Sequence, residues 1–178
     1  MHRETTASEQ QAALAALYDR CGAGVYRFLS AQTGDAERAR ELCQETFLRL
    51  GRTLAAGDAP GEALAFRIAR NLLVSDWRRR RTEARWRDPA PAVAASGASR
   101  EPAPDRASEQ GELRQALASA LAGLPEALRS AILLTEVEGL AYRTVATALD
   151  IPLGTVASRK HEAIARLRES LRRSGHAL

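Results

Sequence analysis

Apolar residues recur at steps of three and four along most of the chain, which is the period of one helix face. The first helix is expected to start near Ser8, an N-cap residue with Gln11 three positions on, and to end at Gly34 and Asp35. Its apolar positions lie on one face: Leu14, Leu17, Tyr18, Cys21, Val25, Phe28 and Leu29.

Two further helices follow from the same pattern. Asp58 can cap the third of them, with Pro60 in its first turn. The second helix has an apolar side, with Ala39, Leu42, Cys43, Phe47, Leu50 and Leu54. Its other side is polar, with Glu37, Arg38, Glu41, Gln44, Glu45 and Arg49. The third helix buries Leu64, Ile68 and Leu72.

The helical pattern breaks between residues 88 and 108. This stretch holds four of the chain's seven prolines and almost no large apolar residue. It cannot bury enough surface to offset the entropy of ordering, so we interpret it as a flexible linker. The sequence therefore predicts two small helical domains, residues 8–87 with three to four helices and residues 109–174 with four.

The second predicted domain contains a helix-turn-helix. A short helix from Tyr142 to Leu149, a tight turn over residues 150–154 and a long helix from Thr155 to about Arg172 make up this motif. A leucine-lined helix (Leu113, Leu117, Leu121 and Leu124) precedes it, and another helix runs from Pro125 to near Gly139.

The long helix of this motif has an inner and an outer face. Val156, Ala163 and Leu167 hold it against the domain. Thr155, Ser158, Arg159 and Glu162 face outward, where a DNA major groove can receive them. The alternative is an ordinary helical hairpin without a ligand, but the turn, the packing positions and the hydroxyl-rich helix start together favour DNA binding.

Composition supports an all-α fold class. Alanine, leucine and arginine are abundant while aromatic residues make up 4% of the chain, which favours helices over strands. No run of about 18 apolar residues is present, so no membrane insertion is expected. The N-terminus, MHRETTASEQQ, lacks a signal-peptide core, and we therefore expect a cytoplasmic location.

Positive charge is concentrated at one place. The chain has a net charge of +4, and the segment from Asp76 to Arg87 alone accounts for it, with six arginines against Asp76 and Glu83. Such a patch is typical of a protein that binds a polyanion. Arginines at a helix end can also complement the helix dipole, but four in succession exceed that need.

The residues of enzyme sites are not found in a catalytic pattern. The sequence has no glycine-rich phosphate loop, no Ser/His/Asp order and no H-E-x-x-H. His2, His161 and His176 are scattered, and Cys21 and Cys43 fall at apolar helix positions typical of buried hydrophobic residues. We therefore expect no enzyme activity, no metal and no cofactor.

Three motifs, in order along the chain, resemble one family, the extracytoplasmic-function (ECF) sigma factors. The resemblance covers nearly the whole chain except the N-terminal tail and the linker. The first two motifs are Glu41–Leu50, and Phe66–Asn71 followed by Asp76 and Arg78–Arg81. The third comprises Glu138-Gly139-Leu140, Tyr142, Ile151-Pro152-Leu153-Gly154-Thr155-Val156 and Ser158-Arg159.

This resemblance implies a bacterial RNA polymerase core and promoter DNA as partners, and an anti-sigma factor as a possible inhibitor. The second helix would dock on the coiled-coil clamp of the largest polymerase subunit, where carboxylates and an amide suit a basic surface. The residues implied for this contact are Glu41, Leu42, Gln44, Glu45 and Leu48.

The third helix and the loop before it would hold the −10 element as a partly single strand, and the loop from Ala55 to Gly61 would supply a base pocket. Holding a melted strand requires positive charge for phosphates and pockets for unstacked bases. The implied residues are Asn71, Ser75, Asp76, Trp77, Arg78, Arg79 and Arg80. Trp77 can either stack on a base or pack in the domain, and the sequence leaves this open.

The helix-turn-helix would bind the −35 element as duplex. The residues implied are Tyr142, Arg143, Thr155, Ala157, Ser158, Arg159, His161 and Glu162. Ala157 and Glu162 stand where the family is commonly basic, and Lys160 stands at a commonly apolar position, from which its side chain must extend toward solvent. We therefore predict a non-standard or weak −35 preference.

A different class of protein remains as the alternative. A helix-turn-helix transcriptional regulator would bind duplex DNA without polymerase, usually as a dimer on a palindrome. Such a regulator lacks both the arginine-rich helix and the polymerase-docking helix of the first predicted domain.

Overall fold

The computed structural model describes residues 7–56, 61–87 and 109–175, and within these ranges every regular element is helical. The all-α prediction is therefore confirmed. The predicted linker and the cap residues Asp58 and Pro60 lie outside the described residues. The elements are α1 (Ala7–Thr33), α2 (Ala36–Ala55), α3 (Glu62–Arg87), α4 (Glu109–Ala122), α5 (Glu126–Ile132), the π-helical η1 (Leu133–Val137), α6 (Tyr142–Leu149) and α7 (Leu153–Arg173).

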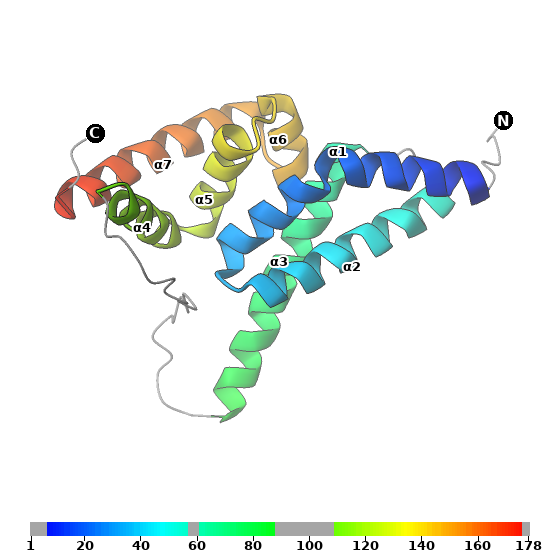
Figure 1. The fold of residues 1–178 in the computed structure, drawn as a ribbon, viewed down its shortest axis with the longest axis horizontal. Helices are drawn as coiled ribbons and strands as arrows, with labels where there is room; N and C mark the ends of the chain where they lie inside the picture. Colours follow the sequence, from blue (N-terminus) through cyan, green and yellow to red (C-terminus); the bar gives the residue numbers. More distant parts are fainter. Residues whose placement is uncertain (1–6, 57–60, 88–108, 176–178) are drawn as a thin grey trace.

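Helices α1 to α3 form the first helix group. α1 and α2 run side by side in opposite directions, α3 crosses them, and the C-terminal end of α3 projects beyond the other helices (Figure 1). Phe28 and Phe66 meet edge to face at 6.0 Å between ring centroids. All six apolar positions predicted on α2 are buried. On α1, Tyr18 is 55% exposed and packs edge to face with Phe47.

The turn between α1 and α2 has a clear local cause. Gly34 adopts a φ of 66°, a left-handed conformation that ends α1. Asp35 then caps α2, because its carboxylate accepts a hydrogen bond from the Arg38 backbone N–H at 3.0 Å. The two residues that the sequence marks as a boundary therefore reverse the chain direction.

Helices α4 to α7 form the second helix group. α7 packs against α4 and α5, and a core of Ala120, Leu124, Leu128, Ile132, Ala163 and Leu167 lies between them. Leu117, predicted to line α4, is instead 39% exposed. Asp150 ends α6 with a left-handed φ of 54°, and α7 starts two residues before the predicted Thr155. The helix-turn-helix is confirmed.

The two helix groups pack against each other and share apolar core. Val145, Leu149 and Val156 of the helix-turn-helix belong to the same buried cluster as Phe66 and Leu73 of α3. Local sequence patterns do not predict which surfaces of the two helix groups pack together. No described helix is both long and apolar enough to cross a membrane.

Polar contacts also join the groups. The Gln32 amide donates to Ser130 Oγ at 2.8 Å and accepts from Arg129 Nε at 2.7 Å. Ser130 Oγ in turn donates to Glu126, which also accepts two hydrogen bonds from Arg70 at 2.9 and 3.1 Å. We call these five residues the interdomain network. Gln32, Arg129 and Ser130 are all buried, where polar groups need hydrogen-bond partners. The network supplies these partners.

A second set of contacts joins α1 to the start of the helix-turn-helix. The Glu138 side chain, 4% exposed, accepts hydrogen bonds from Arg27 at 2.5 and 3.1 Å. Glu138 fits because α1 has a glycine at this point: a Cβ on Gly24 would lie 2.6 Å from a Glu138 carboxylate oxygen. Arg67 of α3 also donates to the Thr147 carbonyl of α6 at 3.0 Å.

Candidate functional site

The polar face of α2 presents most of the residues predicted to dock on polymerase. Glu41 and Gln44 are exposed, Glu45 is half-buried and Leu48 is 51% exposed. Leu42 is 4% exposed and belongs to the core of the first helix group. The surface of this helix therefore offers an apolar side chain among carboxylates and an amide.

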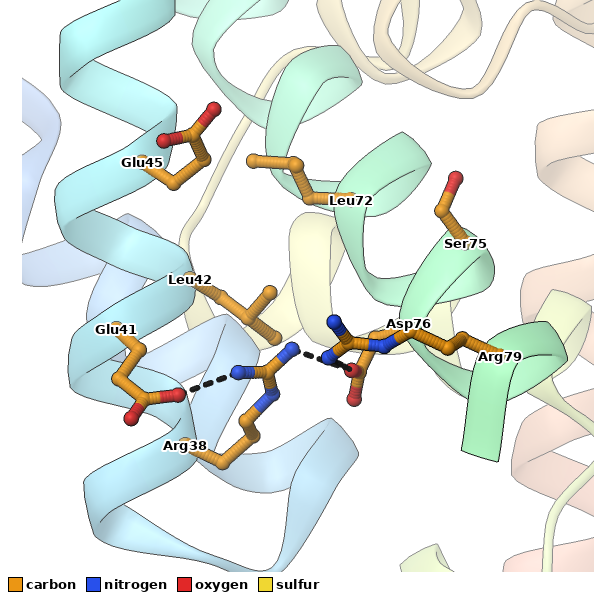
Figure 2. A pocket seen from close by; sticks show the side chains of 8 residues that line it. All are labelled: Arg38, Glu41, Leu42, Glu45, Leu72, Ser75, Asp76 and Arg79. Carbon is orange, nitrogen blue, oxygen red and sulfur yellow. Dashed lines mark hydrogen bonds and ion pairs between the residues drawn. The ribbon is translucent and has the colours of Figure 1, made fainter. Parts of the chain in front are cut away.

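A groove separates this face of α2 from α3. Its α2 wall and its α3 wall meet at Arg38, which lies between Glu41 and Asp76 (Figure 2). The groove is lined by Arg38, Glu41, Leu42, Glu45, Leu72, Ser75, Asp76 and Arg79, and we call it the α2–α3 groove. It brings residues predicted for polymerase docking next to residues predicted for the −10 element.

Asp76 lies at the base of this groove, and its side chain is 3% exposed. Its Oδ1 accepts from Arg38 and from Arg79, the latter at 2.9 Å, and its Oδ2 pairs with Arg80 at 3.0 Å. Burial alone would raise the pKa of this carboxyl, but the hydrogen bonds and charges of the three arginines hold the pKa below its usual value. Asp76 is therefore ionised and paired.

The other residues predicted on α3 divide into two sets. Asn71, Ser75 and Arg78 are exposed and follow each other at steps of four and three, along one face of the helix. Trp77 is half-buried and packs against the core that the two helix groups share. Residues 57–60 of the predicted base-pocket loop lie outside the described part of the chain.

The start of α7 presents the residues predicted to read the −35 element. Ala157, Ser158, His161 and Glu162 are exposed, while Thr155 and Arg159 are half-buried. On α6, Arg143 is exposed and Tyr142 is 37% exposed.

Two charged side chains near the start of α7, Lys160 and Glu162, are paired. Glu162 pairs with Arg166 at 2.7 Å, so its charge is partly neutralised. Lys160 extends out of the packing face as predicted: its ammonium pairs with Glu136 at 2.5 Å and lies 5.3 Å from the centre of the Tyr142 ring. Sequence reasoning missed the Glu136 partner, because a residue 24 positions away carries no periodic signal.

The two cysteines are not part of a surface site. Both are buried, and burial raises the pKa of the Cys21 thiol to about 11 and also raises that of Cys43. Thiols of this kind stay protonated and unreactive at neutral pH. In the part of the chain that the structure describes, no three His, Cys, Asp or Glu side chains are grouped to hold a metal ion.

Comparison with known proteins decides the family. Residues 17–83 match the family model of sigma-70 region 2, and residues 114–167 match that of sigma-70, region 4. The ECF RNA polymerase sigma factor SigL of Mycobacterium tuberculosis is 35% identical over 179 residues, covering 98% of each chain. The chain belongs to the ECF sigma factors. This confirms the resemblance seen in the sequence motifs.

Other relatives agree with this membership. The sigma factor is 34% identical over 149 residues to the ECF RNA polymerase sigma factor SigE of Mycolicibacterium smegmatis, covering 83% of this chain and 57% of the relative. Its fold resembles the sigma factor RpoE of Bartonella quintana, solved in complex with the anti-sigma factor NepR. That similarity has a TM-score of 0.66 at 24% identity and covers 93% of this chain and 95% of the other.

The region 2 match separates this sigma factor from the alternative class. A helix-turn-helix regulator would account for residues 114–167 but not for residues 17–83. The function is therefore that of an RNA polymerase sigma factor rather than a polymerase-independent regulator.

Proposed function

We propose that this sigma factor docks on RNA polymerase core through α2, holds the melted −10 element on α3, and reads the −35 element with α6 and α7. The observation that carries the proposal is the α2–α3 groove, whose two walls bear residues predicted for the first two roles. A single rigid unit would then join polymerase docking to strand capture.

The docking role is supported by the chemistry of the α2 surface. Leu48, at 51% exposure, is an unusual apolar residue on a helix face that also carries Glu41 and Gln44. An apolar anchor surrounded by acidic and amide groups suits a partner surface that is basic with an apolar centre. Leu42 would support this surface from within the core.

Strand capture is supported by the exposed side of α3. Asn71 offers an amide donor and acceptor to a base edge, and Ser75 and Arg78 continue the same face toward the arginine cluster. Arginines bind backbone phosphates in any sequence, while the amide discriminates between bases. Trp77 is assigned to packing rather than to base stacking, because it contacts the core.

The −35 role is supported by the exposed start of α7, where recognition helices contact bases. His161 offers a ring nitrogen, Ser158 offers its hydroxyl oxygen as an acceptor because its hydrogen is donated to the Thr155 carbonyl, and Ala157 offers a methyl group for thymine. Because Glu162 is paired with Arg166 and Lys160 with Glu136, this face carries less positive charge than phosphate contacts would favour. We therefore retain the prediction of a weak or non-standard −35 preference.

Partners and location follow from this role. The chain would act in the cytoplasm, where polymerase meets the genome, and would leave nucleotide addition to the polymerase. The domain boundaries at residues 8–87 and 109–174 stay predictions. An anti-sigma factor is a reasonable inhibitor, since the Bartonella quintana RpoE was solved with one.

Transcription with purified polymerase core tests the proposal. Wild-type chain should direct specific start sites on a promoter library, and Asn71→Ala combined with Arg78→Ala should lose them while still binding core. The matched control is Arg114→Ala with Gln115→Ala, which removes the same two chemistries from exposed positions of α4. A chain that ignores core yet shifts duplex DNA alone would contradict the proposal.

A further inference from the structure

Asp76 is buried among residues that the sigma-factor role places on DNA. With 3% of its side chain exposed, its carboxylate has no surface to offer to a nucleic acid, which it would also repel. It contacts three arginines on two helices instead. A carboxylate so placed acts on its arginine partners rather than on a ligand.

We propose that Asp76 is a positioning residue, which is anchored to α2 by Arg38 and orients Arg79 and Arg80 for the phosphates of the −10 strand. The inference rests on the proposed function of α3. Arg79 and Arg80 follow Asp76 by three and four residues, so both side chains reach back over the same turn of the helix.

The contacts leave both arginines free to bind. Each guanidinium has five N–H donors. Arg79 uses one terminal nitrogen and Arg80 uses Nε to reach Asp76, while 61% and 53% of their side chains remain exposed. Asp76 therefore orders the two side chains before DNA arrives and leaves most of their donors available.

Arg38 fixes the carboxylate itself. Its side chain is 18% exposed, and one terminal nitrogen bonds to Asp76 while the other bonds to Glu41 (Figure 2). Asp76 is thus held from α2 and cannot swing out with the arginines. The same guanidinium also contacts Glu41 of the proposed docking surface, which places both sites on one continuous set of ion pairs.

The Asp76→Asn variant distinguishes a positioning role of Asp76 from a simple effect of its negative charge on DNA binding. Removing a negative charge near DNA should strengthen promoter binding if electrostatics alone mattered. If Asp76 orders Arg79 and Arg80, the Asp76→Asn variant must order two long side chains on binding, and opening of the −10 region should fall about tenfold. Core binding should not change. Opening can be followed by the fluorescence of a 2-aminopurine base in the −10 element.

The salt dependence gives a second readout. Because the disordered arginines hold their phosphates only part of the time, the slope of log affinity against log salt should fall, by at most about 1.8 for two duplex contacts or about 1.4 for two single-strand contacts. Glu83→Gln is the matched control, because Glu83 also pairs with Arg79, at 4.0 Å, but is 58% exposed. Its opening rate and salt slope should match the wild type.

A charge swap distinguishes a positioning role of Asp76 from a role that only stabilises the packing of α2 on α3. Arg38→Asp combined with Asp76→Arg restores an ion pair between α2 and α3 but puts a positive charge beside Arg79 and Arg80. Thermal stability should recover while promoter opening stays low. Full recovery of both would overturn the inference, as would tighter promoter binding by Asp76→Asn. A wild-type chain that fails to bind core would contradict the proposed function instead.

Discussion

Two buried polar clusters hold this sigma factor together, and they differ in chemistry and in place. The Arg38–Asp76 cluster lies within the first helix group, is fully charged, and reaches the surface through Arg79 and Arg80. The interdomain network lies between the groups and links the charged Arg70, Glu126 and Arg129 through two neutral groups, the Gln32 amide and the Ser130 hydroxyl.

The two clusters therefore have different roles: one orients surface side chains, and the other holds the helix groups together. A charged cluster inside one unit stays formed as long as the unit is folded, so it can orient surface groups. The interdomain network lies beside the apolar core that the two groups share, and its side chains can regain hydrogen bonds from water when the groups part. Breaking the first cluster should therefore affect folding, and breaking the second should affect association of the groups.

The largest effect is expected from Arg38→Met. It leaves Asp76 buried with only the two arginines of its own helix, and removing one partner of a buried ion pair costs about 3 kcal/mol of unfolding free energy. Urea denaturation monitored by circular dichroism measures this. A loss below about 0.5 kcal/mol would mean that Arg38 makes no structural tie, since surface pairs contribute that little.

A smaller effect, of about 2 kcal/mol, is expected from Gln32→Leu. This change removes the acceptor of Arg129 Nε and leaves that buried N–H without a partner, while the Arg129 Nη1 keeps its hydrogen bond to the Ala122 carbonyl. The groups should separate rather than unfold, because separation lets Arg129 reach water. Small-angle scattering should report a larger radius of gyration with unchanged helix content. Loss of helix content with no expansion would contradict the comparison.

Gly24→Ala should cost about 1 kcal/mol of association between the groups. The new Cβ would lie 2.6 Å from a Glu138 oxygen, so Glu138 must move away from its site on α1. Fluorescence transfer between labels on α2 and α7 measures the separation. Gly123→Ala is a control, because its Cβ would meet nothing closer than 3.5 Å.

The smallest effect is expected from mild acid. Because the pKa of Asp76 is lowered on folding, its contribution to stability is complete above its unfolded pKa of about 3.9 and is lost as pH falls through the lower folded value. Below about pH 4, wild type should therefore lose more stability than Asp76→Asn. Parallel pH curves for the two proteins would contradict this.

Helix periodicity predicted most of the fold, but not these clusters. Apolar spacing identified buried positions such as Ala39 and Phe47, and turn residues bounded the short helix Tyr142–Leu149 correctly. Asp76 precedes a run of arginines, a context that indicates a solvated surface, so its burial could not be foreseen. Gln32 and Arg129 are 97 residues apart, and local patterns contain no information about such a pair.

The prediction for α4 was less accurate for a related reason. Leucines at helical spacing indicate an apolar face, yet Leu117 is 39% exposed while Leu124 is buried. Only the C-terminal end of α4 lies against α5 and α7, because Ala120 belongs to their shared core, and the predicted Leu124 lies in the turn after α4 and is buried in the same core. Periodicity gives the direction of a face but not how much of its length is covered.

The packing of α6 on α3 has a consequence for promoter occupancy. Elements at −35 and −10 are about 25 base pairs apart, which is about 85 Å along B-DNA. Helices that touch, with Arg67 bonded to the Thr147 carbonyl, cannot span that length. On the proposed assignment, a molecule can hold both elements only after its two helix groups have separated. The apparent dissociation constant for a complete promoter is then the intrinsic one divided by the separated fraction, so each contact between the groups weakens promoter binding without touching DNA.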